Sequence, residues 1–317
     1  MAVAGTQLIN TRRFHLGDAA FRTGLTVAAL IVLVTLGAIL INLLTGGMQA
    51  FKTFGLQFIW STEWDPPRNL YGALPAITGT LVSSIIAIAI AWPIGFGIAF
   101  FLTETCPQPL RTPLGVAIEL LAAVPSIVYG MWGFFILAPV MAEFVQPWMT
   151  EHFYELPLIG VLFQAPPLGV GMLTAGLILA IMILPFIAAS TRDVLLTTPL
   201  ILKEGGYAMG GTRWEVLIDI VLPAARASLF GAVFLGLGRA LGETMAVTFV
   251  IGNANRMPDS LYAPASTIAS VVANTFPEAE VGSLQLAVLL ALGFLLFVVS
   301  FAVLALARVL LRQERMV

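Results

Sequence analysis

The sequence predicts an all-α membrane protein with six transmembrane helices, and three observations support that fold class. Of the 317 residues, 59% are hydrophobic and only 10% are charged, whereas a soluble domain carries about 25% charged residues. The apolar residues gather into stretches of about 20, the length at which a helix crosses a bilayer. Lysine and arginine are also distributed unevenly among the segments that join these stretches.

Six apolar stretches are long enough to span a membrane. Any one of them could be a buried helix of a globular core, but six in one chain favour a membrane protein. Membrane bundles also tolerate prolines inside helices, because neighbouring helices satisfy the freed backbone groups; here Pro93, Pro125 and Pro185 are of this kind. The predicted spans are Leu25–Leu44, Ile77–Phe101, Val116–Met141, Gly169–Ala189, Ala227–Ile251 and Leu284–Leu306.

The positive charges predict the orientation, because cytoplasmic loops carry an excess of Lys and Arg. With a cytoplasmic N-terminus, eleven of these residues fall inside and three outside, and the opposite topology inverts the bias. Both termini are therefore expected in the cytoplasm. The inner residues are Arg12, Arg13, Arg22, Arg111, Arg192, Lys203, Arg213, Arg226, Arg308, Arg312 and Arg315, and the outer ones are Lys52, Arg68 and Arg256.

The ends and the outer loops offer no sign of a separate soluble domain. Residues 1–24 are expected to form a cytoplasmic tail, residues 25–74 the first span and first outer loop, and residues 311–317 a second tail. The first apolar run is too long for a cleavable signal peptide and lacks a following small-x-small site. In the first outer loop, Phe51–Trp60 is expected on the membrane surface, anchored by Trp60 and Trp64.

The second outer loop has an expected position of its own, and the cysteine and histidine residues bear on disulfides and metal sites. The loop 142–168, which carries Glu143, Glu151 and Glu155 and no Lys or Arg, is expected to dip toward the bundle. Cys106 is the single cysteine, so the chain forms no internal disulfide. The two histidines fall on opposite sides of the membrane, which excludes a Cys/His metal site within the chain.

The longest inner segment, 190–226, predicts two short helices joined by a tight turn. Thr198 is the expected N-cap of the first, with Pro199 in its first turn and its end near Met209. Gly210 and Gly211 then interrupt the chain.

The second short helix is expected to open with a capping box. Thr212 precedes Glu215 by three residues, the spacing at which each side chain reaches the backbone N–H of the other. Pro223 is expected to stop this helix just before the fifth span.

Two charged residues lie inside the fifth predicted span. An arginine at the bilayer centre costs about 2.5–3.5 kcal/mol on insertion scales, so Arg239 is expected to face the bundle interior or a water-filled path. Glu243 follows at i+4 and could pair with it on one helix face. The pair could be a structural salt bridge, or a gate or anion contact on a translocation path. The guanidinium donors suit phosphate or sulfate oxygens.

The chain is not expected to hydrolyse ATP. A phosphate-cradling loop needs Gly-Lys followed by Ser or Thr. The two lysines, Lys52 and Lys203, follow Phe51 and Leu202. Any ATPase that drives this protein, with its ATP and magnesium, is expected on another polypeptide, and no cofactor is expected on this chain.

The inner segment resembles the EAA loop of ABC importer permeases. The pattern is Glu-Ala-Ala, three residues, Gly, nine residues and Ile-x-Leu-Pro, and its spacing is matched by Glu204, Gly210, Ile220, Leu222 and Pro223. Gly205 and Gly206 replace the two alanines, a departure that is expected to loosen the first helix and leave the turn intact.

The resemblance implies a type I ABC importer fold with a permease domain over residues 75–310 and a coupling helix that docks on the ATPase. The residues implied at that contact are Glu204, Gly210, Thr212, Arg213, Trp214 and Glu215. Trp and Arg are also frequent anchors of protein interfaces.

The fifth span adds a narrower resemblance. Gly238-Arg239-Ala240-Leu241-Gly242-Glu243-Thr244 is similar to a signature of phosphate-importer permeases, and the following Met-Ala-Val resembles the PstC branch rather than the PstA branch. The segments 79–81, 93–95 with Glu104, and 125–130 resemble the same family. The resemblance implies a phosphate permease of the bacterial inner membrane, with a PstA-like second permease, a PstB-like ATPase dimer and a PstS-like periplasmic phosphate-binding protein as partners.

On this interpretation Arg239, Glu243 and Thr244 lie on the translocation path, with weaker candidates in the second span. Those are Thr78, Thr80, Ser83 and Ser84, which the sequence does not distinguish from packing residues. Glu119 is a further polar contact or simply reaches the interface. The same architecture could import sulfate, molybdate or another oxyanion. The sequence is also compatible with a membrane component of phosphate signalling. An ion-driven secondary transporter is a further option, but it would leave the EAA-like loop unexplained.

Overall fold

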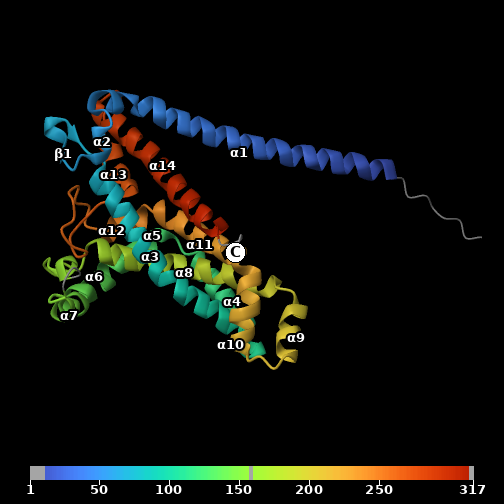
Figure 1. Cartoon of the computed structure of the whole chain (residues 1–317). Helices are drawn as coiled ribbons and strands as arrows, with labels where there is room; N and C mark the ends of the chain where they lie inside the picture. The colour runs from blue at the N-terminus through green and yellow to red at the C-terminus, as the bar shows by residue number, and fades with distance from the viewer. Residues whose placement is uncertain (1–10, 157–159, 314–317) are drawn as a thin grey trace, which may run out of the picture.

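The computed structural model describes residues 11–156 and 160–313, and the fold is almost entirely helical (Figure 1). Within the described residues, six helical stretches are long and apolar enough to cross a membrane. This confirms the predicted fold class. The stretches are Ala20–Phe54, Leu74–Thr105, Ser126–Phe153, Met172–Thr197, Arg213–Leu241 and Leu284–Val309.

Several of these stretches are built from more than one element. The α-helices are α1 (Thr11–Phe54), α2 (Gln57–Trp60), α3 (Leu74–Phe100), α4 (Gln108–Ala122), α5 (Ser126–Trp132), α6 (Ala138–Val140), α7 (Gln146–Phe153), α8 (Met172–Thr197), α9 (Leu200–Ala208), α10 (Arg213–Glu215), α11 (Leu222–Leu241), α12 (Met245–Val250), α13 (Ile268–Thr275) and α14 (Leu284–Gln313). Short 3₁₀ turns cover Pro66–Arg68, Gly160–Phe163 and Phe276–Glu278.

Helix α8 is the central helix of the bundle. In its most apolar stretch 67% of the residues are buried, compared with none in that of α1. Glycines bring its neighbours close: a Cβ at Gly95 of α3 would lie 3.1 Å from Ile187, and one at Gly236 of α11 would lie 2.8 Å from the same side chain. Small residues at helix contacts are how membrane helices gain dispersion energy without a hydrophobic driving force.

The end of the molecule that carries α2 and α13, here called the hairpin end, is packed by aromatic rings. Phe58 is fully buried and lies edge-on to Phe51 at 6.0 Å. A two-stranded antiparallel hairpin, β1 (Trp64–Asp65) and β2 (Leu70–Tyr71), follows α2 and leads into α3. Of the aromatic residues in the segment predicted on the membrane surface, Phe58 is buried in the protein core, whereas Trp60 is 72% exposed.

The third span is displaced from its predicted position. The prediction placed it at Val116–Met141, but α4 ends at Ala122 and Pro125 is the N-cap of α5. Proline lacks an N–H and disfavours helical geometry in the residue before it, so two helices meet at this point. The span runs instead from Ser126 to Phe153, which takes up the first part of the predicted outer loop 142–168.

The fifth span also differs, because Pro223 does not stop a helix. The backbone from Arg213 to Leu241 is continuous, and a π-helical turn, Val216–Val221, precedes the proline. The wider turn accommodates a ring that would clash with the carbonyl four residues earlier. Three further π turns end two residues before a proline: Phe101–Thr105, Gly133–Leu137 and Met141–Val145.

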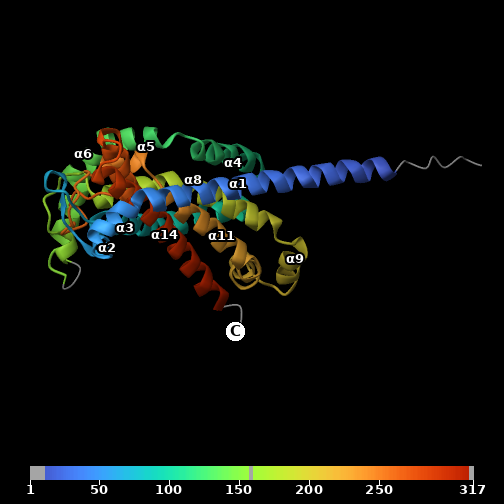
Figure 2. The same ribbon diagram turned by 90° about the horizontal axis from the view of Figure 1, so that it is seen from above.

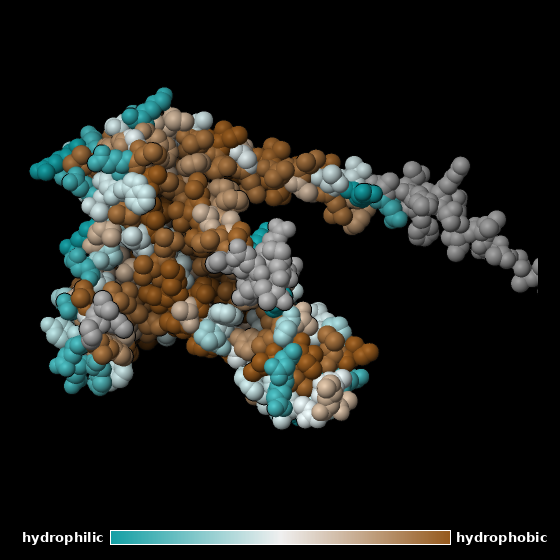
Figure 3. All heavy atoms as spheres, viewed as in Figure 1, coloured by the Kyte–Doolittle hydropathy of each residue, from teal (hydrophilic) through white to brown (hydrophobic). Residues whose placement is uncertain are grey.

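Helix α1 diverges from the bundle (Figures 1 and 2). Its last turns pack on α14, where a Cβ at Gly47 would lie 2.8 Å from the backbone of Ala291. Helix α1 begins at Thr11, within the predicted tail, whose residues 1–10 lie outside the described residues. In Figure 3 a broad hydrophobic surface separates hydrophilic residues at the two ends, as expected of a protein that crosses a bilayer.

Candidate functional site

The loop between α8 and α11, here called the coupling loop (residues 198–215), forms the two short helices that the sequence predicts. Helix α9 ends at Ala208, and Gly210 follows with φ of +87°, a conformation that favours glycine. The predicted N-cap is wrong in detail: Pro199 occupies that position, and the Thr198 hydroxyl lies 3.4 Å from the Val194 carbonyl oxygen, to which it donates.

The capping box at the start of α10 is confirmed. The Glu215 carboxylate accepts a hydrogen bond from the Thr212 backbone N–H at 2.7 Å, and the Thr212 hydroxyl accepts one from the Glu215 N–H at 3.3 Å. Two orphan donors of the helix start are thus satisfied. Because the helix opens here, Trp214 is carried to the surface, where it is 55% exposed.

The two glycines that replace alanines in the EAA-like pattern lie in different surroundings. A Cβ at Gly205 would meet no atom within 4 Å. A Cβ at Gly206 would lie 2.6 Å from the Cδ1 atom of Ile220 and 2.8 Å from Val216. Gly206 therefore allows α9 to pack directly on the π turn that follows α10.

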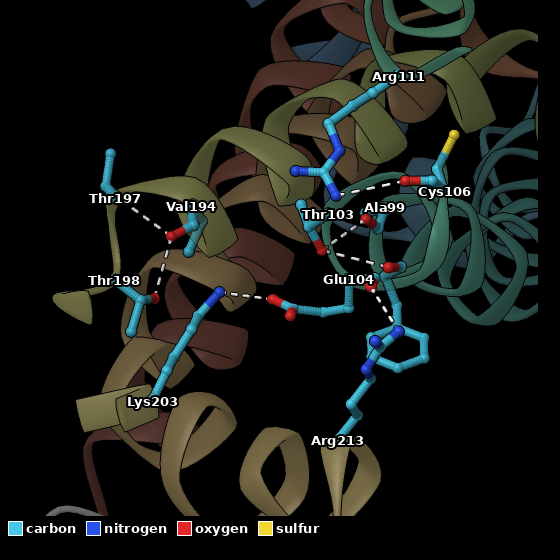
Figure 4. A network of polar contacts seen from close by, with 11 residues as sticks. Ala99, Thr103, Glu104, Cys106, Arg111, Val194, Thr197, Thr198, Lys203 and Arg213 are labelled. Carbon is cyan, nitrogen blue, oxygen red and sulfur yellow. Dashed lines mark hydrogen bonds and ion pairs between the residues drawn. The ribbon is translucent and has the colours of Figure 1, made fainter. Parts of the chain in front are cut away.

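The coupling loop is held by the end of α3 (Figure 4). The Lys203 ammonium lies 2.5 Å from the Glu104 carboxylate, and the two side chains are only 13% and 15% exposed. The Arg213 guanidinium donates to the Glu104 carbonyl oxygen at 3.3 Å, and Arg111 donates to the Cys106 carbonyl oxygen at 3.4 Å.

Three cations therefore surround the C-terminal end of one transmembrane helix. The last carbonyl groups of a helix have no partners within it and carry a partial negative charge, which cations stabilise. A ring contact adds to this attachment, because Trp214 lies edge-on to Phe100 with 5.5 Å between ring centroids. Helix α10 and the coupling loop are thus attached to the end of α3 by polar and ring contacts.

A second polar connection joins α4 to the end of α8. Arg192 pairs with Glu119 at 3.0 Å. A Cβ at Gly115 would lie 2.9 Å from the Arg192 guanidinium, so the glycine leaves room for it against α4. Glu119, one of the polar residues that the sequence pointed out, is 57% exposed and its role here is to pair with Arg192.

Arg239 lies in the last turn of α11 and is half-buried. Three ion pairs are found among the described residues, and Arg239 belongs to none of them. The Tyr129 hydroxyl in α5 donates to the Leu121 carbonyl oxygen at 2.9 Å. A cation at the position of Arg239 complements the negative end of the helix dipole.

The expected pairing of Arg239 with Glu243 on one helix face is wrong. Helix α11 ends at Leu241, and α12 begins at Met245. The Glu243 carboxylate accepts a hydrogen bond from the Ala246 N–H at 3.3 Å, and the Thr244 carbonyl oxygen accepts one from Thr248 at 2.7 Å. The helix is interrupted because Gly242 has a low helix propensity and Glu243 satisfies an orphan donor of α12.

Two of the hydroxyl candidates in the second span, Thr80 and Ser83, form hydrogen bonds within the helix packing. Thr80, which is 2% exposed, donates to the Ala76 carbonyl oxygen at 2.7 Å and accepts from the Ile268 N–H at 2.9 Å. Ser83, 1% exposed, donates to the Gly79 carbonyl oxygen at 2.7 Å. The Ser83 hydroxyl therefore bonds within α3, whereas the Thr80 hydroxyl also connects α3 to the start of α13.

Sequence reasoning missed the attachment of the coupling loop to α3. Glu104 was noted only as part of a segment that resembles phosphate-importer permeases. Lys203 was noted only as one of the positive charges that predict the orientation in the membrane. The two residues are 99 positions apart, so no local spacing pairs them. Opposite charges at the ends of adjacent spans were the one available signal.

Comparison with known proteins identifies the chain's relatives. Residues 93–315 match the family described as "Binding-protein-dependent transport system inner membrane component". The chain is 54% identical to the phosphate transport system permease protein PstC of Xylella fastidiosa, over 93% of this chain and 90% of the relative. It is 52% identical to the PstC protein of Mesorhizobium japonicum, over 98% and 95%.

Solved structures show the same fold at low sequence identity. A chain of the bacterial alginate ABC transporter aligns with a TM-score of 0.60 and 14% identity, covering 95% of this chain and 97% of that one. A chain of the inward-facing MetNI methionine ABC transporter aligns with a TM-score of 0.55 and 18% identity, covering 78% and 99%. These likenesses confirm the predicted type I ABC importer fold.

Proposed function

The chain belongs to the family of binding-protein-dependent transport system inner membrane components, and we propose that it conducts inorganic phosphate in an ATP-driven importer. It is a multi-pass protein of the inner membrane and a permease subunit of an ABC transporter. One observation supports phosphate above all others: the relatives that are about half identical over nearly the whole chain are phosphate permeases.

The proposed mechanism needs other chains on both sides of the membrane. A PstS-like binding protein delivers phosphate to this permease and a PstA-like second permease. A PstB-like ATPase dimer binds ATP and magnesium and docks on the coupling loops. Closure of the ATPases moves the coupling loop, and the contacts of Lys203 and Arg213 with Glu104 carry that motion into α3.

The docking surface on the coupling loop is supported by exposed side chains around the turn. Met209 is 91% exposed and Trp214 55% exposed, and Glu204 is exposed as well. Gly210 and Thr212 with Glu215 fix the backbone that presents these groups. An exposed aromatic ring on a rigid turn suits a pocket on a partner chain.

Arg239 is the group proposed to contact the anion. It is half-buried and has no carboxylate partner among the described residues, so its donors are available to phosphate oxygens. Glu243 and Thr244 lie in the interruption between α11 and α12, where backbone groups are not all used within a helix. In membrane proteins such interruptions persist where they line a cavity or are buried in protein.

Uptake measurements test this proposal. The complete importer, with binding protein, second permease and ATPase, is reconstituted in proteoliposomes, and ATP-dependent phosphate uptake is measured. We expect Arg239→Gln to lower uptake about tenfold to a hundredfold, because a charge-assisted hydrogen bond contributes about 1.5–3 kcal/mol. Arg226→Gln, which removes an exposed arginine near the other end of α11, should leave uptake near that of the wild type.

Three controls distinguish a role of Arg239 on the phosphate path from a packing role, phosphate from another oxyanion, and an ATP-driven mechanism from transport without an ATPase. Assembly and ATPase docking must survive in Arg239→Gln, so that the loss reports on the path. Normal uptake by that variant would reduce Arg239 to a packing residue. Preferential inhibition by sulfate or molybdate would overturn phosphate as the substrate, and uptake without the ATPase would overturn the ABC mechanism.

A further inference from the structure

A groove of ≈ 730 Å³ lies between α8, α11 and α14. Its walls are mainly apolar, and two of its large lining side chains are exposed: Leu235 is 63% and Phe301 is 68% exposed. A glycine widens it, because a Cβ at Gly231 would meet no atom within 4 Å. An apolar groove of this size between membrane helices has room for an acyl chain.

The groove also has three polar lining residues. Ser190 lies in the last third of α8, Ser228 in the first half of α11, and Arg308 at the end of the sixth span, which places Arg308 at the membrane boundary that carries the coupling loop. Arg308 is exposed, and it belongs to none of the three ion pairs found in the described part of the chain. Its guanidinium donors are free to bind a phosphate group.

The length of the groove fits one leaflet. Phe301 and Arg308 are seven residues apart on α14, which corresponds to about 10 Å along a helix. Half of a bilayer's hydrocarbon core is about 15 Å thick. The groove therefore extends from the boundary toward the bilayer centre without crossing it.

We propose that this groove binds an anionic phospholipid. One acyl chain lies along Gly231, Leu235 and Phe301, and the headgroup phosphate binds Arg308 with hydrogen bonds from the two serine hydroxyls. Basic pockets between transmembrane helices on the cytoplasmic side bind anionic headgroups in this way. The lipid lies against the stretch Arg213–Leu241, which joins the coupling loop to Arg239.

Photocrosslinking in the assembled importer tests the proposal. The complex is placed in nanodiscs that contain phosphatidylglycerol with a diazirine in the middle of one acyl chain, and labelled peptides are identified by mass spectrometry. Peptides that contain residues 228–235 and 301–309 should be labelled severalfold more by this probe than by the matching phosphatidylcholine probe, because Arg308 favours the anionic headgroup.

Two variants and a control make the test specific. Gly231→Leu places a branched side chain in the groove at a position where a Cβ meets no atom within 4 Å, and it should abolish labelling of these peptides. Arg308→Gln should lower phosphatidylglycerol labelling to the phosphatidylcholine level. Arg256→Gln, an exposed arginine in another loop, should change nothing. Equal labelling by the two probes, or labelling that survives Gly231→Leu, would overturn the proposal. So would absence of labelling in the wild type, which is expected if a second chain covers the groove.

Discussion

Gly205 and Gly206 show how much of a residue's role depends on its tertiary neighbours. Both are helical residues of α9, and both stand where the family pattern has alanine. Gly205 borders open space, whereas Gly206 is buried against the side chains of Ile220 and Val216. The same substitution should therefore have opposite effects at the two positions.

We predict that Gly205→Ala stabilises α9 by about 0.5–1 kcal/mol, because alanine has the higher helix propensity and nothing obstructs its methyl group. Gly206→Ala should loosen the packing of α9 on the following π turn. Hydrogen exchange of residues 200–209 in the assembled importer measures both effects. Exchange should slow about twofold to fivefold in Gly205→Ala and quicken in Gly206→Ala; slower exchange in both variants would contradict the packing argument.

Residue-scale features were predictable where they are local. The capping box of Thr212 and Glu215 depends on a three-residue spacing, and the structure confirms it. The Gly210 turn depends on a backbone conformation that few other residues adopt, and it is confirmed as well. The pairing of Arg239 with Glu243 was wrong because it assumed an unbroken helix, and that assumption concerns an element rather than a residue.

At the scale of elements, the bridge between Glu104 and Lys203 joins the end of α3 to α9. Both side chains are largely buried, and the removal of one partner from a buried pair leaves an uncompensated charge at a cost of about 3–5 kcal/mol. The exposed pair Arg68–Asp65, with side chains 79% and 39% exposed, provides a comparison whose loss costs less than about 1 kcal/mol.

We predict that Lys203→Met lowers both the thermal stability of the purified permease and the ATP-dependent uptake of the assembled importer. Arg68→Gln should leave both near the wild-type values. The exchanged double variant, Glu104→Lys with Lys203→Glu, should recover part of the loss, because it restores opposite charges at the same place. If Lys203→Met transports normally, the bridge does not connect ATPase closure to α3.

The ends of the helices were predictable only where the effect of a proline or glycine on the backbone does not depend on neighbouring helices. The number and order of the spans follow from apolar length, and they are confirmed. Pro125 ends a helix, Pro223 follows a π turn within a continuous one, and Pro93 and Pro185 lie inside α3 and α8. Which of these occurs depends on whether neighbouring helices hold the widened turn in place, and that information is not local.

At the scale of the whole molecule, charge and hydropathy determine how the chain lies in the bilayer. Arg111, Arg192, Lys203 and Arg213 all gather at the end that carries the coupling loop. Helix α7 extends the third span to Phe153, so Glu151 lies at the far end of that span from Ser126. The separation of charge between the two ends predicts a cytoplasmic coupling loop.

Cysteine accessibility tests this topology. In a chain whose buried Cys106 is replaced by serine, we introduce either Glu204→Cys in the coupling loop or Glu151→Cys at the end of α7, both of which are exposed positions. A membrane-impermeant maleimide applied to intact spheroplasts should label the Glu151→Cys variant and leave Glu204→Cys unlabelled. Inverted membrane vesicles should give the reverse, because they turn the cytoplasmic face outward.

The paired design distinguishes topology from concealment by partner chains. A coupling loop covered by a docked ATPase would leave Glu204→Cys unlabelled from either side, and removal of the ATPase from inverted vesicles should then restore labelling. Labelling of Glu204→Cys in intact spheroplasts would place the coupling loop outside. Because an ATPase that uses cytoplasmic ATP could not then reach the loop, that result would refute the orientation and the proposed coupling mechanism together.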